Sequence, residues 1–246
     1  FHGTPACLSS LYAAGRHDEL IDLLRNERFW SYKRWAVKAL LAQGKTAEAI
    51  RLAEACRDPW SSDLDIDRLC EEALLASGFA DEAYRRYGLR ANRAGTYVAW
   101  FRAVARKYPH KKPAELLHDL AAASPGEEGK WFAAAKEGKL FTEAIELANR
   151  SPCSPATLIR AARDFAEENP EFALEAGMAA LRWLLEGHGY EITGLDVERA
   201  YIRTMKAAQN AGAAEGARQR IQDLVAKKST GQSLVTAVLN RCLGSS

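Results

Sequence analysis

The sequence predicts an all-α protein in which antiparallel helix hairpins are stacked into an α-solenoid. First, Ala- and Leu-rich amphipathic runs, broken by charged residues, follow one another along the whole chain. Second, a glycine-containing turn recurs at intervals typical of one helix hairpin. Third, strand signals are lacking, because neither sustained apolar–polar alternation nor an Asn-Gly or Asp-Gly turn occurs. The 246 residues are 48% apolar, which is enough to bury a sizeable core.

The recurring turn is found in four segments, AAGRHDELIDLL, AQGKTAEAIRLA, ASGFADEAYRRY and KEGKLFTEAIELA. Their glycines are Gly15, Gly44, Gly78 and Gly138, separated by 29, 34 and 60 residues. Glycine ends a helix readily because it adopts the left-handed conformation without a Cβ penalty. The glutamate that follows each glycine meets the positive end of the next helix dipole. Each segment is therefore predicted to join the two helices of a hairpin.

The second of these turns, Gly44-Lys45-Thr46, also has the letters that end a phosphate-binding P-loop. That loop needs upstream glycines and a buried strand before it. Here Ala39 stands five positions before Gly44, and the preceding AVKALLAQ favours helix. We therefore predict a helix–helix turn, with Thr46 as the N-cap of the second helix.

The hydrophobic periodicity places helices along the rest of the chain, and three of them begin with proline at their first position: Pro113, Pro155 and Pro170. The acidic run that starts at Asp63 resembles the beginning of a calcium loop, but it lacks the required glycine after Asp67, so we expect it to begin a helix. The predicted spans are 5–14, 17–26, 29–43, 46–57, 63–77, 80–90, 93–108, 113–123, 127–137, 140–150, 155–168, 170–187, 195–211, 214–228 and 231–243.

The glycine-rich segment from Gly187 to Gly194 is the longest break in this pattern. We expect it to be a plain connector, not a functional loop, between a helical repeat array, residues 1–187, and a C-terminal helical segment, residues 188–246, that packs on the array within one continuous domain. Because the chain begins with Phe1 and not Met, we also expect it to be a domain of a longer protein.

The turns resemble those of the tetratricopeptide repeat (TPR) family. The similarity lies in the steps Gly44–Glu48–Ala49 and Gly78–Glu82–Ala83, which are 34 residues apart, and in an aromatic residue at Tyr87. The chain departs from the family at Lys33 and Asp67, where an aromatic residue is usual, and at Glu71, where a small residue is usual.

The resemblance implies a right-handed solenoid that binds proteins or peptides. In such a fold the first helix of each pair lines a concave groove. At the matching positions, the resemblance places four residues in that groove: Arg34, Lys38, Arg68 and Glu72.

Charge is unevenly distributed, although the formal net charge is only +2. No acidic residue lies between Glu82 and Glu115, and residues 83–114 carry arginines and lysines with interleaved aromatic residues. The candidate partner-binding residues are Arg86, Arg90, Arg93, Arg102, Arg106, Lys107, Lys111 and Lys112. They could pair with acidic side chains of neighbouring helices, bind an acidic protein partner, or contact nucleic acid through phosphates and stacked bases.

Catalytic and cofactor motifs are not evident. The five cysteines form no CxxC pair, which favours free thiols in a reducing cytoplasm over a disulfide framework or a zinc site. No HExxH or GxSxG motif occurs. We therefore expect neither a metal nor a cofactor, and a catalytic role for Cys153 would need a histidine and an acid close to it in space.

No apolar run is long enough to cross a membrane, so we expect no membrane partner. The sequence thus predicts a non-catalytic scaffold that binds a peptide, a partner protein or another domain of its own longer chain, with an acidic partner favoured by the basic stretch. The alternative is a nucleic-acid-binding helical repeat that uses residues 83–114.

Overall fold

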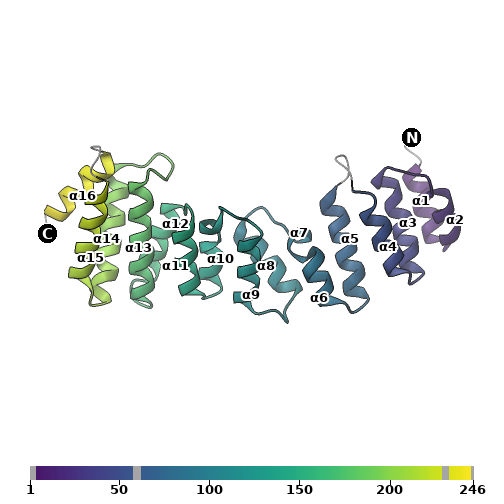
Figure 1. Cartoon of the computed structure of the whole chain (residues 1–246), viewed down its shortest axis with the longest axis horizontal. Coiled ribbons are helices and arrows are strands. Elements are labelled where there is room, and N and C mark those ends of the chain that lie inside the picture. Colours follow the sequence, from purple (N-terminus) through teal and green to yellow (C-terminus); the bar gives the residue numbers. More distant parts are fainter. Residues whose placement is uncertain (1–3, 58–61, 229–232, 245–246) are drawn as a thin grey trace. The chain divides into compact units, whose positions relative to one another are not determined.

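The computed structural model describes residues 4–57, 62–228 and 233–244, so Phe1, on which the expectation of a longer chain rests, lies outside this description. Across these ranges every regular element is a helix and no strand occurs, which confirms the all-α prediction (Figure 1). In chain order the elements are α1 (Thr4–Ala13), α2 (His17–Leu23), α3 (Trp30–Ala42), α4 (Thr46–Glu54), α5 (Asp63–Ala76), α6 (Ala80–Ala83), the π-helical turn η1 (Tyr84–Gly88), α7 (Leu89–Ala91), α8 (Tyr97–Lys107), α9 (Pro113–Ala122), the 3-10 turn η2 (Glu128–Trp131), α10 (Phe132–Glu137), α11 (Phe141–Arg150), α12 (Pro155–Asp164), α13 (Pro170–Leu185), α14 (Gly194–Asn210), α15 (Ala214–Lys227) and α16 (Leu234–Gly244).

The helices group into two units. Unit 1 comprises Phe1–Ala94 and Arg106–Pro109, and unit 2 comprises Gly95–Ala105 and His110–Ser246. The predicted boundary after residue 187 falls inside unit 2. There α13 and α14 pack on each other, and one apolar core runs from Ala166 to Leu239.

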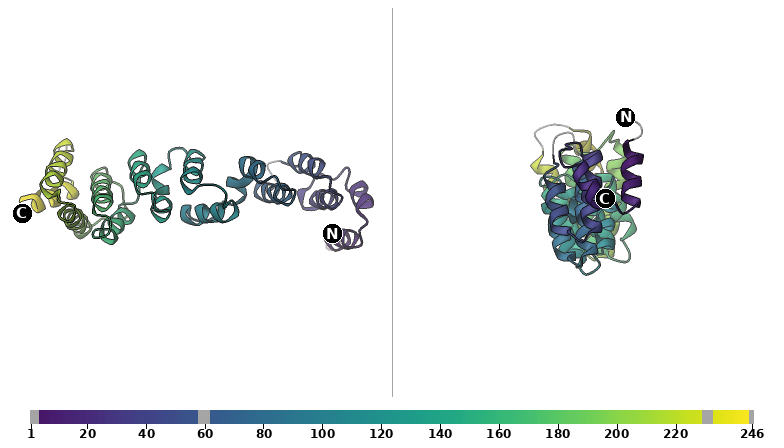
Figure 2. Two further views of the ribbon diagram at one scale, coloured as in Figure 1. Left: turned by 90° about the horizontal axis from the view of Figure 1, so that it is seen from below. Right: turned by 90° about the vertical axis from the view of Figure 1, so that its right-hand side faces the viewer.

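Within each unit most helices contact the next helix in the chain and, in several cases, the one after it. In unit 1, α3 packs on α1, α2 and α4 around Leu8, Leu20 and Ala36. In unit 2, α13 lies beside α11, α12, α14 and α15 (Figure 2). This nearest-neighbour packing buries apolar faces that a single hairpin would leave exposed.

Three of the four predicted glycine turns have the expected geometry. Gly15, Gly44 and Gly78 have φ angles of 70°, 74° and 80°. After Gly44, the Lys45 N–H donates to the Leu40 carbonyl at 2.9 Å, as in a Schellman C-cap. Sequence reasoning missed a similar turn at Gly212, where φ is 67° between α14 and α15.

The prediction was wrong at the fourth turn. Gly138 has a φ of −72°, and Lys139 takes the left-handed conformation with a φ of 57°. The reason is that the interval from Gly138 to Glu143 is one residue longer than the interval from Gly44 to Glu48. The residue in register with the other glycines is therefore Lys139.

Helix starts follow the proline signals, but two other predicted starts were wrong. The helix predicted over 93–108 begins only at Tyr97, and the start predicted at 231 lies outside the described residues. Pro113, Pro155 and Pro170 each open a helix, as predicted. Thr46 is not the N-cap of α4, because the first intrahelical bond runs from the Ala49 N–H to the Lys45 carbonyl, which makes Lys45 the cap residue. The Thr46 hydroxyl instead lies 3.1 Å from the Ser77 hydroxyl.

Candidate functional site

The helix α5 carries two buried carboxylates in unit 1. Asp67 and Glu71 lie one turn apart, with exposed fractions of 2% and 0%. Ser62 caps the start of α5 by accepting a bond from the Asp65 N–H, so the acidic run begins a helix as expected. Because charged groups are rarely buried without partners, the surroundings of Asp67 and Glu71 decide whether they are structural or functional.

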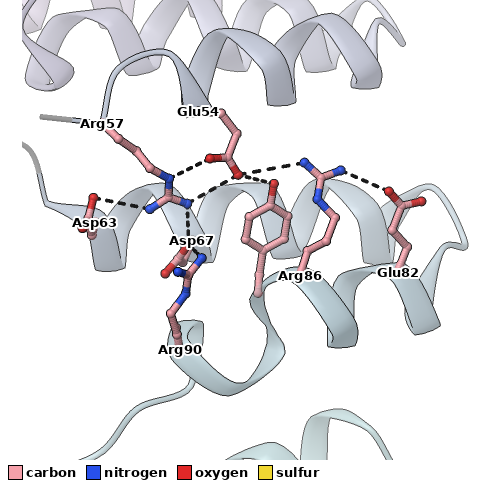
Figure 3. Close-up of polar contacts among 8 residues, drawn as sticks. Glu54, Arg57, Asp63, Asp67, Glu82, Arg86 and Arg90 are labelled. Atoms are coloured by element: carbon pink, nitrogen blue, oxygen red, sulfur yellow. Dashed lines mark hydrogen bonds and ion pairs between the residues drawn. The ribbon is translucent and has the colours of Figure 1, made fainter. Parts of the chain in front are cut away.

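Two arginines hold the Asp67 carboxylate (Figure 3). The Nη2 atoms of Arg57 and Arg90 lie 2.5 Å and 3.1 Å from its Oδ1 atom. Arg57 also binds Glu54, with a distance of 2.7 Å from its Nε to Oε2, and lies 3.3 Å from Asp63. One guanidinium therefore ties the end of α4 to the first two turns of α5.

The same network extends to η1 through Glu54. The Tyr87 hydroxyl donates to Oε1 of Glu54 at 2.5 Å. An Nη atom of Arg86 lies 3.9 Å from the same Glu54 oxygen (Figure 3). The Arg57 hydrogen bond holds the pKa of Glu54 below its ordinary value of 4.5. Burial and the bond to Glu54 raise the pKa of Tyr87. Both groups therefore keep their ordinary charge at neutral pH.

The Glu71 carboxylate has a separate set of donors. It accepts bonds from Lys107 Nζ at 2.6 Å and from the Tyr108 hydroxyl and Asn92 Nδ2 at 2.5 Å each. The Tyr108 ring packs against the backbone at Gly88, where an added Cβ would lie 3.0 Å from the ring. Gly88 thus gives the ring the room that brings the Tyr108 hydroxyl to Glu71.

Most of the predicted basic residues have carboxylate partners inside the chain. Arg86 pairs with Glu82 at 3.0 Å, Lys111 pairs with Glu115 at 3.4 Å, and Arg102 binds Glu137 through two hydrogen bonds. With Arg90 and Lys107, five of the eight candidates are paired with such groups. Arg93, Arg106 and Lys112 are exposed, and Arg106 and Lys112 form no ion pair with a described residue.

The interleaved aromatic rings are mostly core residues. Tyr84, Tyr87, Trp100, Phe101 and Tyr108 have exposed fractions of at most 9%. Rings buried in this way pack against neighbouring helices and offer no free face to a base. The observed pairing and burial therefore match the intramolecular interpretation of this stretch more closely than the nucleic-acid interpretation.

The four residues that the TPR resemblance places in a groove lie on α3 and α5. Arg34 and Glu72 are exposed, and Lys38 Nζ lies 4.9 Å from the centroid of the Trp35 ring. Arg68 Nε donates to the Ala91 carbonyl at 3.1 Å. Across the described part of the chain, no hydrogen bond or ion pair joins any two of these four, so the groove stays a prediction.

Sequence reasoning missed the buried charges, although the signal was present. The three departures from the TPR pattern, Lys33, Asp67 and Glu71, are buried. Lys33 Nζ donates to the Leu24 and Arg25 carbonyls at 2.8 Å and 2.7 Å, just after α2 ends. A charged residue at a position where a core residue is usual thus indicated a buried polar contact.

Unit 2 carries a series of adjoining clefts. A cleft of about 630 Å³ and one of about 490 Å³ share Phe141 and Asn169, and the second shares Glu175 with a cleft of about 340 Å³. Their walls come from several helices, chiefly α10, α11, α13 and α15. Such a row suits an extended ligand better than a single small molecule.

Chemical reactivity is not favoured at Cys153, which the sequence singled out. Burial raises the pKa of its thiol to about 12, whereas a nucleophilic cysteine needs a lowered pKa. All five cysteines are free thiols. Within the described ranges no group of three or more histidine, cysteine, aspartate or glutamate side chains is arranged to hold a metal ion. No described helix has the length and apolar character needed to span a membrane.

Comparison with known proteins does not assign the chain to a family, because no family model, curated protein or solved structure matches it.

Proposed function

We propose that the chain is a non-catalytic scaffold that binds a peptide segment of a partner protein, or of another domain of its own longer chain, along the adjoining clefts of unit 2. The observation that carries this proposal is the sharing of lining residues between the three clefts. A ligand that spans them contacts several hairpins at once, which is the binding mode of helical repeats. The left-handed glycine turns at Gly15, Gly44 and Gly78 support a TPR-like right-handed solenoid as the framework. The free cysteines favour a cytoplasmic location.

Affinity capture with two surface variants tests this function. Thr142 is exposed and lines the middle cleft without a described side-chain hydrogen bond, so Thr142→Trp blocks the cleft without removing a contact. The matched variant, Arg106→Glu with Lys112→Glu, reverses two exposed charges of the basic stretch. Circular dichroism first checks that both variants keep the helical content of the unmodified chain.

We expect a protein that the unmodified chain captures from nuclease-treated lysate to be lost with Thr142→Trp and kept with the charge-reversal variant. The nucleic-acid alternative predicts the opposite. In that case nuclease treatment or charge reversal removes the captured material, and binding falls steeply as salt rises because counterions are released from phosphates. That outcome would refute the scaffold proposal.

A further inference from the structure

We infer that the cleft of about 630 Å³ in unit 2 binds a partner segment in which a bulky apolar side chain stands next to acidic residues. This inference rests on the proposed scaffold function and adds the chemistry of the occupant. It is carried by the apolar floor of the cleft, by two lysines at its rim, and by the backbone conformation of one of them.

The floor is apolar and preformed. Val98, Phe141 and Phe165 line it, and the rings of Phe141 and Phe165 meet edge to face at 5.4 Å. The buried Phe172 backs both rings, with centroid distances of 4.7 Å and 5.3 Å. Because Phe141 and Phe165 are held from behind but remain half-buried, an apolar side chain can cover them with little reorganisation of the protein.

The rim attracts carboxylates. Lys136 Nζ lies 5.8 Å from the Phe165 ring centroid, and Lys139 lines the same cleft. Neither ammonium group forms a hydrogen bond or ion pair with a described residue. The carboxylate of Glu137, which also lines the cleft, is bound by Arg102. Glu168 is the remaining acidic group in the lining, so the two lysines dominate the local charge and complement an acidic segment.

The backbone at Lys139 is an independent observation. Its φ of 57° is one that glycine adopts freely and that costs a residue with a Cβ conformational free energy. Glycine occupies the equivalent position in the turns at Gly15, Gly44 and Gly78. Lysine at this position gives up turn stability and places a second ammonium group at the rim of the cleft. A role of the Lys139 charge in binding explains why lysine stands here in spite of the lower turn stability.

The adjoining cleft of about 490 Å³ determines which end of the partner segment carries the acidic residues. Its charged lining residues are three glutamates, Glu146, Glu171 and Glu175. Arg220 binds Glu175 at 2.6 Å and Arg150 lies 3.8 Å from Glu146, so Glu171 is the lining carboxylate whose charge no described ion pair offsets. Acidic residues of the partner are therefore repelled there and favoured near Lys136 and Lys139. A segment that spans both clefts should carry its acidic residues at the lysine end only.

Selection from a phage library of short random peptides on the full chain tests the inference. We expect enrichment of Asp or Glu beside Phe, Leu or Trp. The most enriched peptide, labelled with fluorescein, then serves as the probe in anisotropy titrations. Changing both Lys136 and Lys139 to Gln should weaken its binding about three- to tenfold, since each exposed pair contributes only modestly. Lys112→Gln, an exposed lysine of the same unit without a described ion pair, should leave the affinity unchanged.

Lys139→Gly separates binding from folding. It should raise the thermal midpoint, because glycine suits the left-handed turn, and yet weaken peptide binding about twofold or more. Equal affinity of the unmodified chain and the Lys136/Lys139 double variant for the probe would overturn this inference and leave the scaffold function standing. Failure to select any peptide would overturn both.

Discussion

Each buried charge among the described residues of unit 1 is satisfied by groups from beyond its own helix. Lys33 uses two carbonyls that follow the end of α2, Asp67 uses the two arginines Arg57 and Arg90, and Glu71 uses Lys107, Tyr108 and Asn92. Such contacts add little net stability over an apolar core, but they penalise any packing that leaves one charge without its partner. At the scale of the residue, these charges therefore specify which helices meet.

Single residues also set the turns. Gly44→Ala should lower the free energy of unfolding by about 1 kcal/mol, because alanine disfavours the left-handed φ of 74°. Gly138→Ala is the matched control, because its φ of −72° is open to alanine and its added Cβ would make only ordinary contacts. Urea unfolding followed by circular dichroism gives both values. Equal losses at the two sites would contradict the assignment of Lys139 as the left-handed residue of the fourth turn.

At the scale of the element, the last residue of α8 provides an ion-pair partner for a buried carboxylate of α5. Lys107 reaches the fully buried Glu71, whereas its neighbour Arg106 is exposed and forms no ion pair with a described residue. Lys107 is partly exposed itself, with 30% of its side chain accessible, so water screens some of its charge. The two adjacent basic residues thus differ in what they contribute to folding.

Lys107→Met should lower the free energy of unfolding by about 2 kcal/mol, since Glu71 stays buried with one fewer donor. Arg106→Met should change it by less than about 0.5 kcal/mol. Adding Glu71→Leu to Lys107→Met should recover part of the loss, because the orphaned carboxylate is removed. Equilibrium unfolding of the three variants measures the coupling, and a Lys107→Met loss that matches the Arg106→Met loss would show that the contact is not formed.

The local part of this organisation could be predicted from sequence, and the long-range part could not. Helices that begin at Pro113, Pro155 and Pro170, and turns at Gly15, Gly44 and Gly78, depend on nearby residues. The pairing of Lys107 with Glu71 and the meeting of Phe141 with Phe165 depend on which helices pack together. The basic stretch therefore looked like a free surface, although most of its charges have carboxylate partners supplied by other parts of the chain.

At the scale of the whole molecule, acid should weaken the fold. Hydrogen bonds hold the pKa values of Glu54, Glu128 and Asp196 below their ordinary values of 4.5, 4.5 and 3.8. A depressed carboxyl pKa stabilises the folded state above the unfolded-state pKa, and this contribution is lost as pH falls through the folded-state value. The urea midpoint should therefore be steady from about pH 7 to pH 5 and decline below about pH 4.5.

Glu54→Gln should make this decline shallower, because it removes one of the titrating groups. Glu48→Gln, on an exposed glutamate of the same helix, is a suitable control for the change of charge. A midpoint that rises on acidification would contradict the depressed pKa values.

The burial of two thiols, one in each unit, gives the chain built-in reporters of its own fluctuations. Cys70 in unit 1 and Cys153 in unit 2 are 0% and 4% exposed, and burial raises their pKa values to about 11 and about 12. A thiol reagent can modify them only in molecules whose surrounding helices have momentarily separated. The exposed Cys7 reacts without such an event. The ratio of the two slow labelling rates, read by mass spectrometry, therefore compares how often each half of the chain opens, without any introduced probe.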